Sequence, residues 1–268
     1  MPRRPLARRL LLTLLALVLV WAAAGALLTR QRAERREAEL GAAVAGARPL
    51  LEAVHAELRR EARLLAQDPA VVEGTLRASP RMLALTLERL ADLLVIVDAA
   101  GVPLVQVPAT PRMTLPALTP SGEGPPRVAV INDRAYVLGV APLPAGLVVV
   151  GRRLEALERA LARLPSRTAL VAVVGDRAVG STLPGAPLAG WAGVPGAGLT
   201  VGGEPWVARA LAPADAVAVT VLASDAAHRA DTRRFWLWWA GSLAATAGVA
   251  LALLVKRSRP LSGADAAT

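Results

Sequence analysis

Hydrophobic positions form two uncharged runs near the ends of the chain and shorter periodic patterns between them. The runs cover residues 10–29 and 235–255, which gives 20 and 21 residues without a charge. A helix of that length crosses the hydrocarbon layer of a membrane, about 30 Å at about 1.5 Å per residue. The basic start before the first run also has the layout of a secretory signal, but the length of the run favours an uncleaved anchor. We therefore predict two transmembrane helices that flank a loop of residues 30–234.

The first part of the loop, residues 30–66, has an apolar stripe at helical spacing. Apolar side chains recur every three or four residues from Leu40 to Leu65, with charged residues between them. This pattern predicts a stalk helix that continues from the first span, and we expect Pro49 to kink or interrupt it. Two interpretations of the stripe stay open: packing on the protein's own domain, or the seam of a coiled-coil dimer.

Residues 67–165 change from helical to strand periodicity. Asp68 and Ser79 each precede a proline, which is typical of a capped helix start, and they predict short helices near 69–77 and 80–92. Alternating apolar runs with turns between them then predict five strands and a closing helix. These elements cover residues 93–107 (two strands), 127–143 (two strands around Asn132 and Asp133), 145–153 and 154–164.

Residues 166–224 repeat the same pattern at shorter length. The run 94–102 corresponds to 170–179, and the hairpin that contains Tyr136 corresponds to one that contains Trp206. Because matched blocks recur in the same order, we predict two small antiparallel-sheet domains in tandem. A helix then enters the second span, so that residues 225–255 form one rod.

Net charge and composition exclude some classes of partner. Of the net charge of +10, residues 1–9 carry +4 and residues 256–268 carry +2, which leaves only +4 for the loop. The loop also has just three aromatic residues for stacking on bases, so we expect no nucleic-acid partner.

The distribution of Lys and Arg does not decide the membrane orientation, because these residues are balanced across each span. Loops far longer than about 60 residues, however, cross membranes largely regardless of charge. Both tails are therefore expected in the cytoplasm.

Catalytic chemistry is sparse in the loop. It has no HExxH motif, no phosphate-binding loop that ends in Gly-Lys and no lysine, and the chain has no cysteine. His55 in the stalk and His228 before the second span are expected to be ordinary residues on helix surfaces rather than ligands. We therefore expect no enzyme activity, no metal and no cofactor.

The order of these elements resembles the double Cache sensor region of bacterial histidine kinases, chemoreceptors and cyclases. The segments that carry the resemblance are LLAQDPAVVEG (64–74), LVIVDAAGVPL (94–104) and SRTALVAVVGDRAVGSTLP (166–184). It implies an α+β membrane protein in which two transmembrane helices flank a long stalk helix and two tandem PAS/Cache-like antiparallel-sheet domains. It also implies a bacterial inner-membrane location with residues 30–234 extracytoplasmic. Two features depart from the family: the aromatic-rich signature for amino acids is missing, and the chain ends at Thr268 without an output domain.

The leading hypothesis is a membrane-anchored sensory protein whose small-molecule ligand is unknown. Arg112 on a proline-rich loop and Tyr136 on the central hairpin are the candidate ligand contacts, although a solvated charge and core packing are their simpler roles. The lipid bilayer is one partner, a membrane signalling protein in trans would supply the output, and the stripe and the small residues of the second span predict a homodimer. The alternative is a structural or accessory component of an envelope assembly. A polar cavity would favour sensing, and an exposed apolar patch would favour assembly.

Overall fold

The contacts within the chain divide it into two compact units. One unit combines Met1–Glu37 with Ala226–Thr268, and the other is Ala38–Asp225. The first holds both predicted membrane helices and the second holds both predicted sheets, so the sheets belong to one compact unit. The computed structural model describes residues 4–74, 79–87, 91–108, 126–164, 167–175, 177–184, 198–212 and 217–258.

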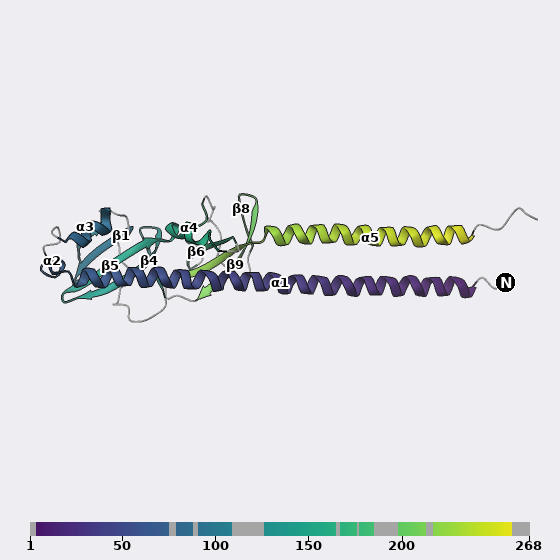
Figure 1. Cartoon of the computed structure of the whole chain (residues 1–268), viewed down its shortest axis with the longest axis horizontal. Helices are drawn as coiled ribbons and strands as arrows, with labels where there is room; N and C mark the ends of the chain where they lie inside the picture. Colours follow the sequence, from purple (N-terminus) through teal and green to yellow (C-terminus); the bar gives the residue numbers. More distant parts are fainter. Residues whose placement is uncertain are drawn as a thin grey trace, which may run out of the picture. The chain divides into compact units, whose positions relative to one another are not determined.

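Helix α1 runs without a break from Arg4 to Ala66 (Figure 1). Pro49 lies inside it, so the predicted interruption at this residue was wrong. Proline removes the hydrogen bond to the carbonyl four residues earlier, which here belongs to Ala45. Both Pro49 and Ala45 are exposed, and water can therefore replace the missing donor.

The first repeat forms a five-stranded antiparallel sheet with two short helices before it. Helix α2 ends after one turn because Gly74 follows with φ of 76°, a left-handed conformation that terminates helices. The predicted helix over 154–164 is shorter than expected: a 3₁₀ turn, Leu154–Leu157, is followed by the single α-helical turn α4, Glu158–Leu161. The other elements are α2 (Pro69–Val72), α3 (Pro80–Leu87), β1 (Leu93–Asp98), β2 (Pro103–Val107), β3 (Arg127–Ile131), β4 (Arg134–Leu143) and β5 (Gly146–Arg153).

The second repeat builds a sheet of the same design, which confirms the predicted pair of antiparallel sheets. The sheets have the orders β2-β1-β5-β4-β3 and β7-β6-β10-β9-β8, so each strand has a counterpart in the same position. Equivalent hairpins also turn through two left-handed residues, Asn132–Asp133 in the first sheet and Gly202–Gly203 in the second. The strands of the second sheet are β6 (Thr168–Val174), β7 (Arg177–Ser181), β8 (Gly198–Val201), β9 (Glu204–Ala212) and β10 (Ala218–Ser224).

The apolar stripe of α1 packs against one face of each sheet. Its residues between Leu40 and Leu65 are buried in one cluster with side chains of both sheets, such as Val137 and Val221. Figure 1 shows α1 beside both sheets within this unit. At Gly139 a Cβ atom would overlap the backbone of Leu58 and Arg59, so the helix approaches strand β4 closely. The stripe is therefore occupied by the protein's own sheets and does not provide a coiled-coil seam.

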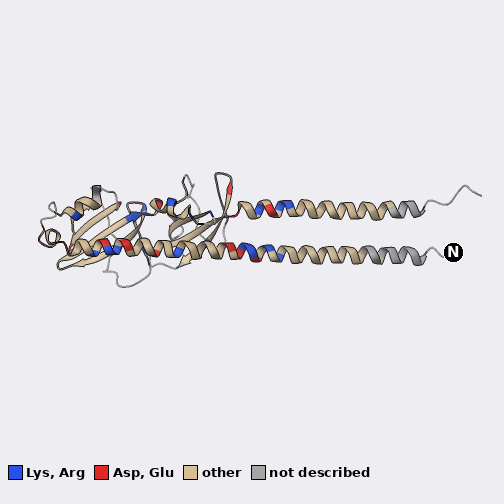
Figure 2. Ribbon diagram, viewed as in Figure 1, with Lys and Arg blue, Asp and Glu red and all other residues tan. Residues whose placement is uncertain are grey.

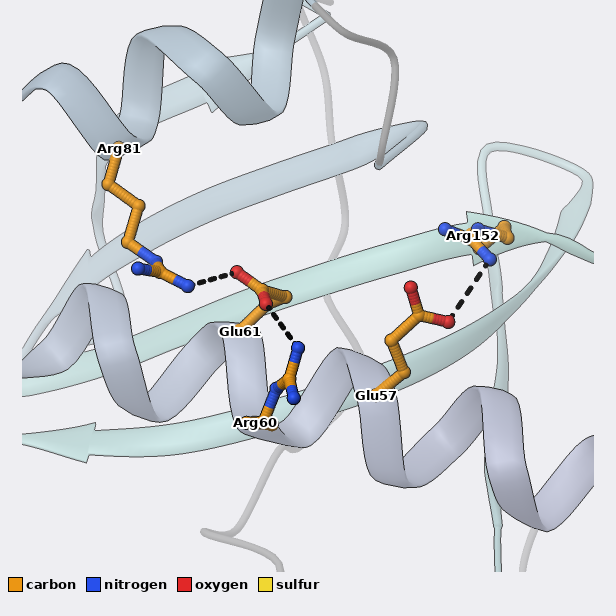
Figure 3. Close-up of polar contacts among 5 residues, drawn as sticks. All are labelled: Glu57, Arg60, Glu61, Arg81 and Arg152. Carbon is orange, nitrogen blue, oxygen red and sulfur yellow. Dashed lines mark hydrogen bonds and ion pairs between the residues drawn. The ribbon is translucent and has the colours of Figure 1, made fainter.

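Polar contacts fix the short helices and β5 against α1. Glu61 of α1 accepts from Arg81 of α3 at 2.8 Å, and Glu57 lies 3.5 Å from Arg152 of β5 (Figure 3). Asp68 caps α2 by accepting from the amide of Ala70 at 3.0 Å, and it also accepts from the hydroxyl of Ser79, which caps α3. The two predicted capping residues therefore also bind each other, which joins the starts of the two helices.

His55 is buried in the core, and the prediction that it lies on the surface of the stalk was wrong. Its side chain is 4% exposed, and its Nδ1 lies 2.7 Å from the carbonyl oxygen of Leu138. Because a carbonyl only accepts, Nδ1 carries the proton. Burial lowers the pKa of His55, and the charges of Arg59 and Arg127 also lower it, whereas the bond to Leu138 raises it.

The other unit contains the first part of α1 and helix α5, Ala226–Ser258. Both helices are long and apolar enough to cross a membrane, and only 6% and 0% of their apolar windows are buried. A core helix of a soluble protein would be mostly buried instead. Figure 2 shows long uncharged stretches on both helices next to clusters of charged residues. Trp21 of α1 meets Trp239 of α5 edge to face, with ring centroids 6.2 Å apart.

Candidate ligand-binding cavities

A cavity lies at the corresponding end of each sheet, on the face opposite to the one that packs against α1. Side chains alternate between the two faces along a strand, and the opposite faces have their own small clusters around Tyr136 and Trp206. Tyr136 of β4 pairs with Arg153 of β5, and Trp206 of β9 pairs with Ser224 of β10. The two aromatic residues therefore occupy equivalent positions, as the sequence repeat predicted.

The cavity of the first sheet is small and cationic. Its volume is about 210 Å³, and Tyr136, Arg134 and Arg153 are among the residues that line it. The backbone amide of Arg153 donates to Asp92 at 2.9 Å, whereas its buried Nε has no partner among the described residues. This arrangement could receive a carboxylate, but the volume is below the range of about 300–1,000 Å³ that is typical of ligand pockets.

The cavity of the second sheet is twice as large and falls within that range. Its volume is about 430 Å³, and it lies among α4, the start of β6, the end of β7 and the β8–β9 turn. Trp206 lines it and is 3% exposed, and within the described part of the chain its indole Nε1–H has no acceptor. Leaving a buried donor unpaired costs about 1–3 kcal/mol. The cavity thus contains a hydrogen-bond donor that an oxygen of a bound molecule could satisfy.

The polar side chains around Trp206 form hydrogen bonds with one another or with the backbone. Both carboxylate oxygens of Glu204 accept from Arg167, at 3.0 and 2.9 Å, and the hydroxyl of Ser224 donates to the same carboxylate. Thr182 is buried, and its hydroxyl oxygen accepts from the amide of Leu170 at 2.8 Å. Because these groups are already oriented, a ligand would pay little ordering entropy to meet them.

The structure does not test whether the sequence-predicted residues contact a ligand. Tyr136 does line a cavity, and it is also 4% exposed, so core packing describes its position equally well. Arg112 lies outside the described residues, and its role stays a prediction. The sequence analysis missed Trp206, Arg167 and Glu204 as site residues. The equivalence of Trp206 with Tyr136 was the signal that could have identified the first of them.

No family model and no curated protein matches this chain. Among solved structures, it is similar to the ligand-binding domain of the Pseudomonas aeruginosa amino acid chemoreceptor PctB with L-arginine. That match has a TM-score of 0.42 at 12% identity and covers 72% of this chain and 95% of the domain. The ligand-binding domain of the Pseudomonas fluorescens chemoreceptor CtaA with L-alanine gives a TM-score of 0.41 at 13% identity, over 71% of this chain and 95% of the domain.

The periplasmic domain of Vibrio cholerae LuxQ is a third similar structure. Its TM-score is 0.38 at 14% identity, over 68% of this chain and 98% of that domain. At such values the likeness concerns the arrangement of helices and strands. We therefore base the proposed function on the topology and cavities of this chain itself.

Proposed function

We propose that this chain is a membrane-anchored extracytoplasmic sensory protein that binds a small molecule beside Trp206. The supporting observation is the 430 Å³ cavity with a buried indole N–H that has no acceptor in the described part of the chain. Two apolar helices with exposed side chains flank the sheets in the sequence and support the anchoring. The resemblance of the sequence to double Cache sensor regions agrees with this function.

The lining of the cavity defines the chemistry of the ligand. Trp206 can only donate, so the ligand needs a carbonyl, carboxylate or hydroxyl oxygen near Nε1. Leu164, Leu183 and Val201 offer apolar contacts to its remaining atoms. A ligand with a cationic group could further approach Glu158, which is exposed at the rim. The class that fits is a small organic molecule with one oxygen acceptor and an apolar part.

Envelope assembly, the alternative function, would need an exposed apolar patch as a docking surface. In the described part of the sheet unit, the exposed large apolar residues are distributed over α2, α3, the β1–β2 hairpin and β6. Single exposed apolar residues are normal on soluble surfaces. The cavity therefore favours sensing over assembly.

A ligand screen with two matched variants tests the proposal. The full chain in detergent is screened against small metabolites by thermal shift, and the affinity of each stabilising compound is measured by calorimetry. Trp206→Phe replaces the indole with a smaller phenyl ring and removes the N–H, so affinity should fall by about 3- to 10-fold. Tyr136→Phe removes the hydroxyl of the equivalent aromatic residue in the other sheet and should leave affinity unchanged. The proposal fails if no compound stabilises the protein, or if Tyr136→Phe weakens binding and Trp206→Phe does not.

A further inference from the structure

A third, smaller cavity lies in the unit formed by the first part of α1 and α5. It has a volume of about 190 Å³ and is lined by Arg32, Arg36 and Glu37 of α1 and by His228, Thr232 and Trp236 of α5, among others. This volume is too small to enclose a drug-sized molecule, but it holds several waters or one small anionic group.

Two donors in this cavity have no acceptor. Nη1 of Arg32 and Oγ1 of Thr232 are both buried, and neither has a hydrogen-bond partner among the residues that the structure describes. The guanidinium carbon of Arg32 lies 3.8 Å from the centroid of the Phe235 ring, which fixes the plane of its N–H groups. A planar guanidinium beside a hydroxyl is suited to two oxygens of one anion, and phosphate has that geometry.

The position of the cavity along the helices matches the depth of lipid phosphates. Arg32 lies three residues beyond Thr29, where the first uncharged run ends, and Thr232 lies three residues before Phe235, where the second begins. Three residues of helix rise by about 4.5 Å. The polar headgroup region is about 5–8 Å thick on each side of the hydrocarbon layer. Trp236 lines the cavity, and aromatic rings favour the membrane interface.

The charge around the cavity favours an anionic lipid. Residues 30–37 and 226–236 together carry seven arginines and three carboxylates. We propose that this cavity binds the phosphate of an anionic phospholipid, with Arg32 and Thr232 as donors. The proposal rests on the membrane anchoring in the proposed function.

Lipid titration of the purified full chain tests the site. The chain in detergent is titrated with phosphatidylglycerol or phosphatidylcholine, and bound lipids are counted by native mass spectrometry. Arg32→Gln should weaken phosphatidylglycerol binding by about 10-fold or more, because a charged hydrogen bond is lost. Arg30→Gln is the matched control: it removes the same charge from the same helix, but Arg30 is 80% exposed and pairs with Glu34. Its effect should stay within about twofold.

A second variant and a second anion make the result decisive. Thr232→Val keeps the net charge and should weaken binding by about 3- to 10-fold, while tryptophan emission confirms that the helices still pack. Inorganic phosphate should not displace the lipid. Equal losses in Arg30→Gln and Arg32→Gln, no preference for phosphatidylglycerol, or displacement by inorganic phosphate would each overturn the lipid site. Release of the chain from membranes by alkaline carbonate would instead show that the proposed membrane anchoring is wrong. Failure of the proposed function is in this way distinguished from failure of the lipid site.

Discussion

Acid should destabilise the sheet unit through one histidine. Residues 38–225 contain His55 and not His228, so a fragment of this compact unit has a single titrating imidazole. Burial lowers the pKa of His55 below the ordinary value of 6.5. The unfolded chain then binds a proton below about pH 6.5 that the folded protein does not. The contribution of neutral His55 to stability is complete above that pH and is lost as the pH falls.

The size of the effect follows from proton linkage. Between the ordinary pKa and the lowered one, the free energy of unfolding should fall by at most about 1.4 kcal/mol per pH unit. Other groups titrate too, so the quantity to measure is the difference between the natural fragment and His55→Asn in urea unfolding. Asn is the appropriate replacement because its amide can donate to the Leu138 carbonyl in place of Nδ1–H.

The difference in unfolding free energy between the two proteins should be constant above about pH 7.5 and should shrink steadily below about pH 6.5. A difference that stays constant down to about pH 5, or that grows in acid, would refute the assignment of His55 as a buried neutral residue. An NMR titration of the imidazole in the folded fragment gives an independent check, since its midpoint should lie below that of a histidine peptide.

Three further outcomes follow from the structure. Gly139→Ala should lower the free energy of unfolding by about 1–3 kcal/mol or more, because its Cβ would overlap the α1 backbone. Gly41→Ala, on open helix surface, should not lower it. Urea unfolding of residues 30–234 measures both variants, and equal losses would contradict the close approach of α1 to β4. Without ligand, Trp206→Phe should lower the free energy of unfolding by less than the about 2–5 kcal/mol of a typical core truncation, because it removes an unpaired buried donor. A larger loss in urea unfolding would contradict this expectation. Alkaline phosphatase fused at residue 120 should be active and fused at Thr268 inactive, and the reverse pattern would refute the proposed topology.

Local signals explain which parts of the fold could be predicted. The hairpins were found because each depends on neighbouring residues: Asn132–Asp133 adopt the left-handed angles that a two-residue turn requires. The caps at Asp68 and Ser79 were found for the same reason. The strand order was not predicted, because β1 pairs with β5 across a long separation that no local pattern records.

His55 and Trp206 show what depends on tertiary packing. His55 follows Leu51 by four residues and precedes Leu58 by three, so it belongs to the buried stripe, but a polar side chain at such a position is more often exposed. The Trp206 cavity combines residues of α4, β6, β8 and β9 with the segment that follows β7, and these are close only after the sheet has formed. The sequence repeat could identify Trp206 as the equivalent of Tyr136, whereas the volume of the cavity and the unpaired N–H of Trp206 could not be predicted from the sequence.

Ligand contact with the Trp206 indole is the most direct test of the proposed sensor. In residues 38–225 only Trp191 and Trp206 contribute indole N–H signals, and Trp206→Phe assigns them. With ¹⁵N-labelled tryptophan, a compound selected by the thermal-shift screen should move the Trp206 signal downfield in a saturable way, because Nε1–H gains an acceptor. It should also slow the exchange of that proton with solvent. A Trp206 signal that stays fixed while a stabilising compound saturates the protein would contradict the account.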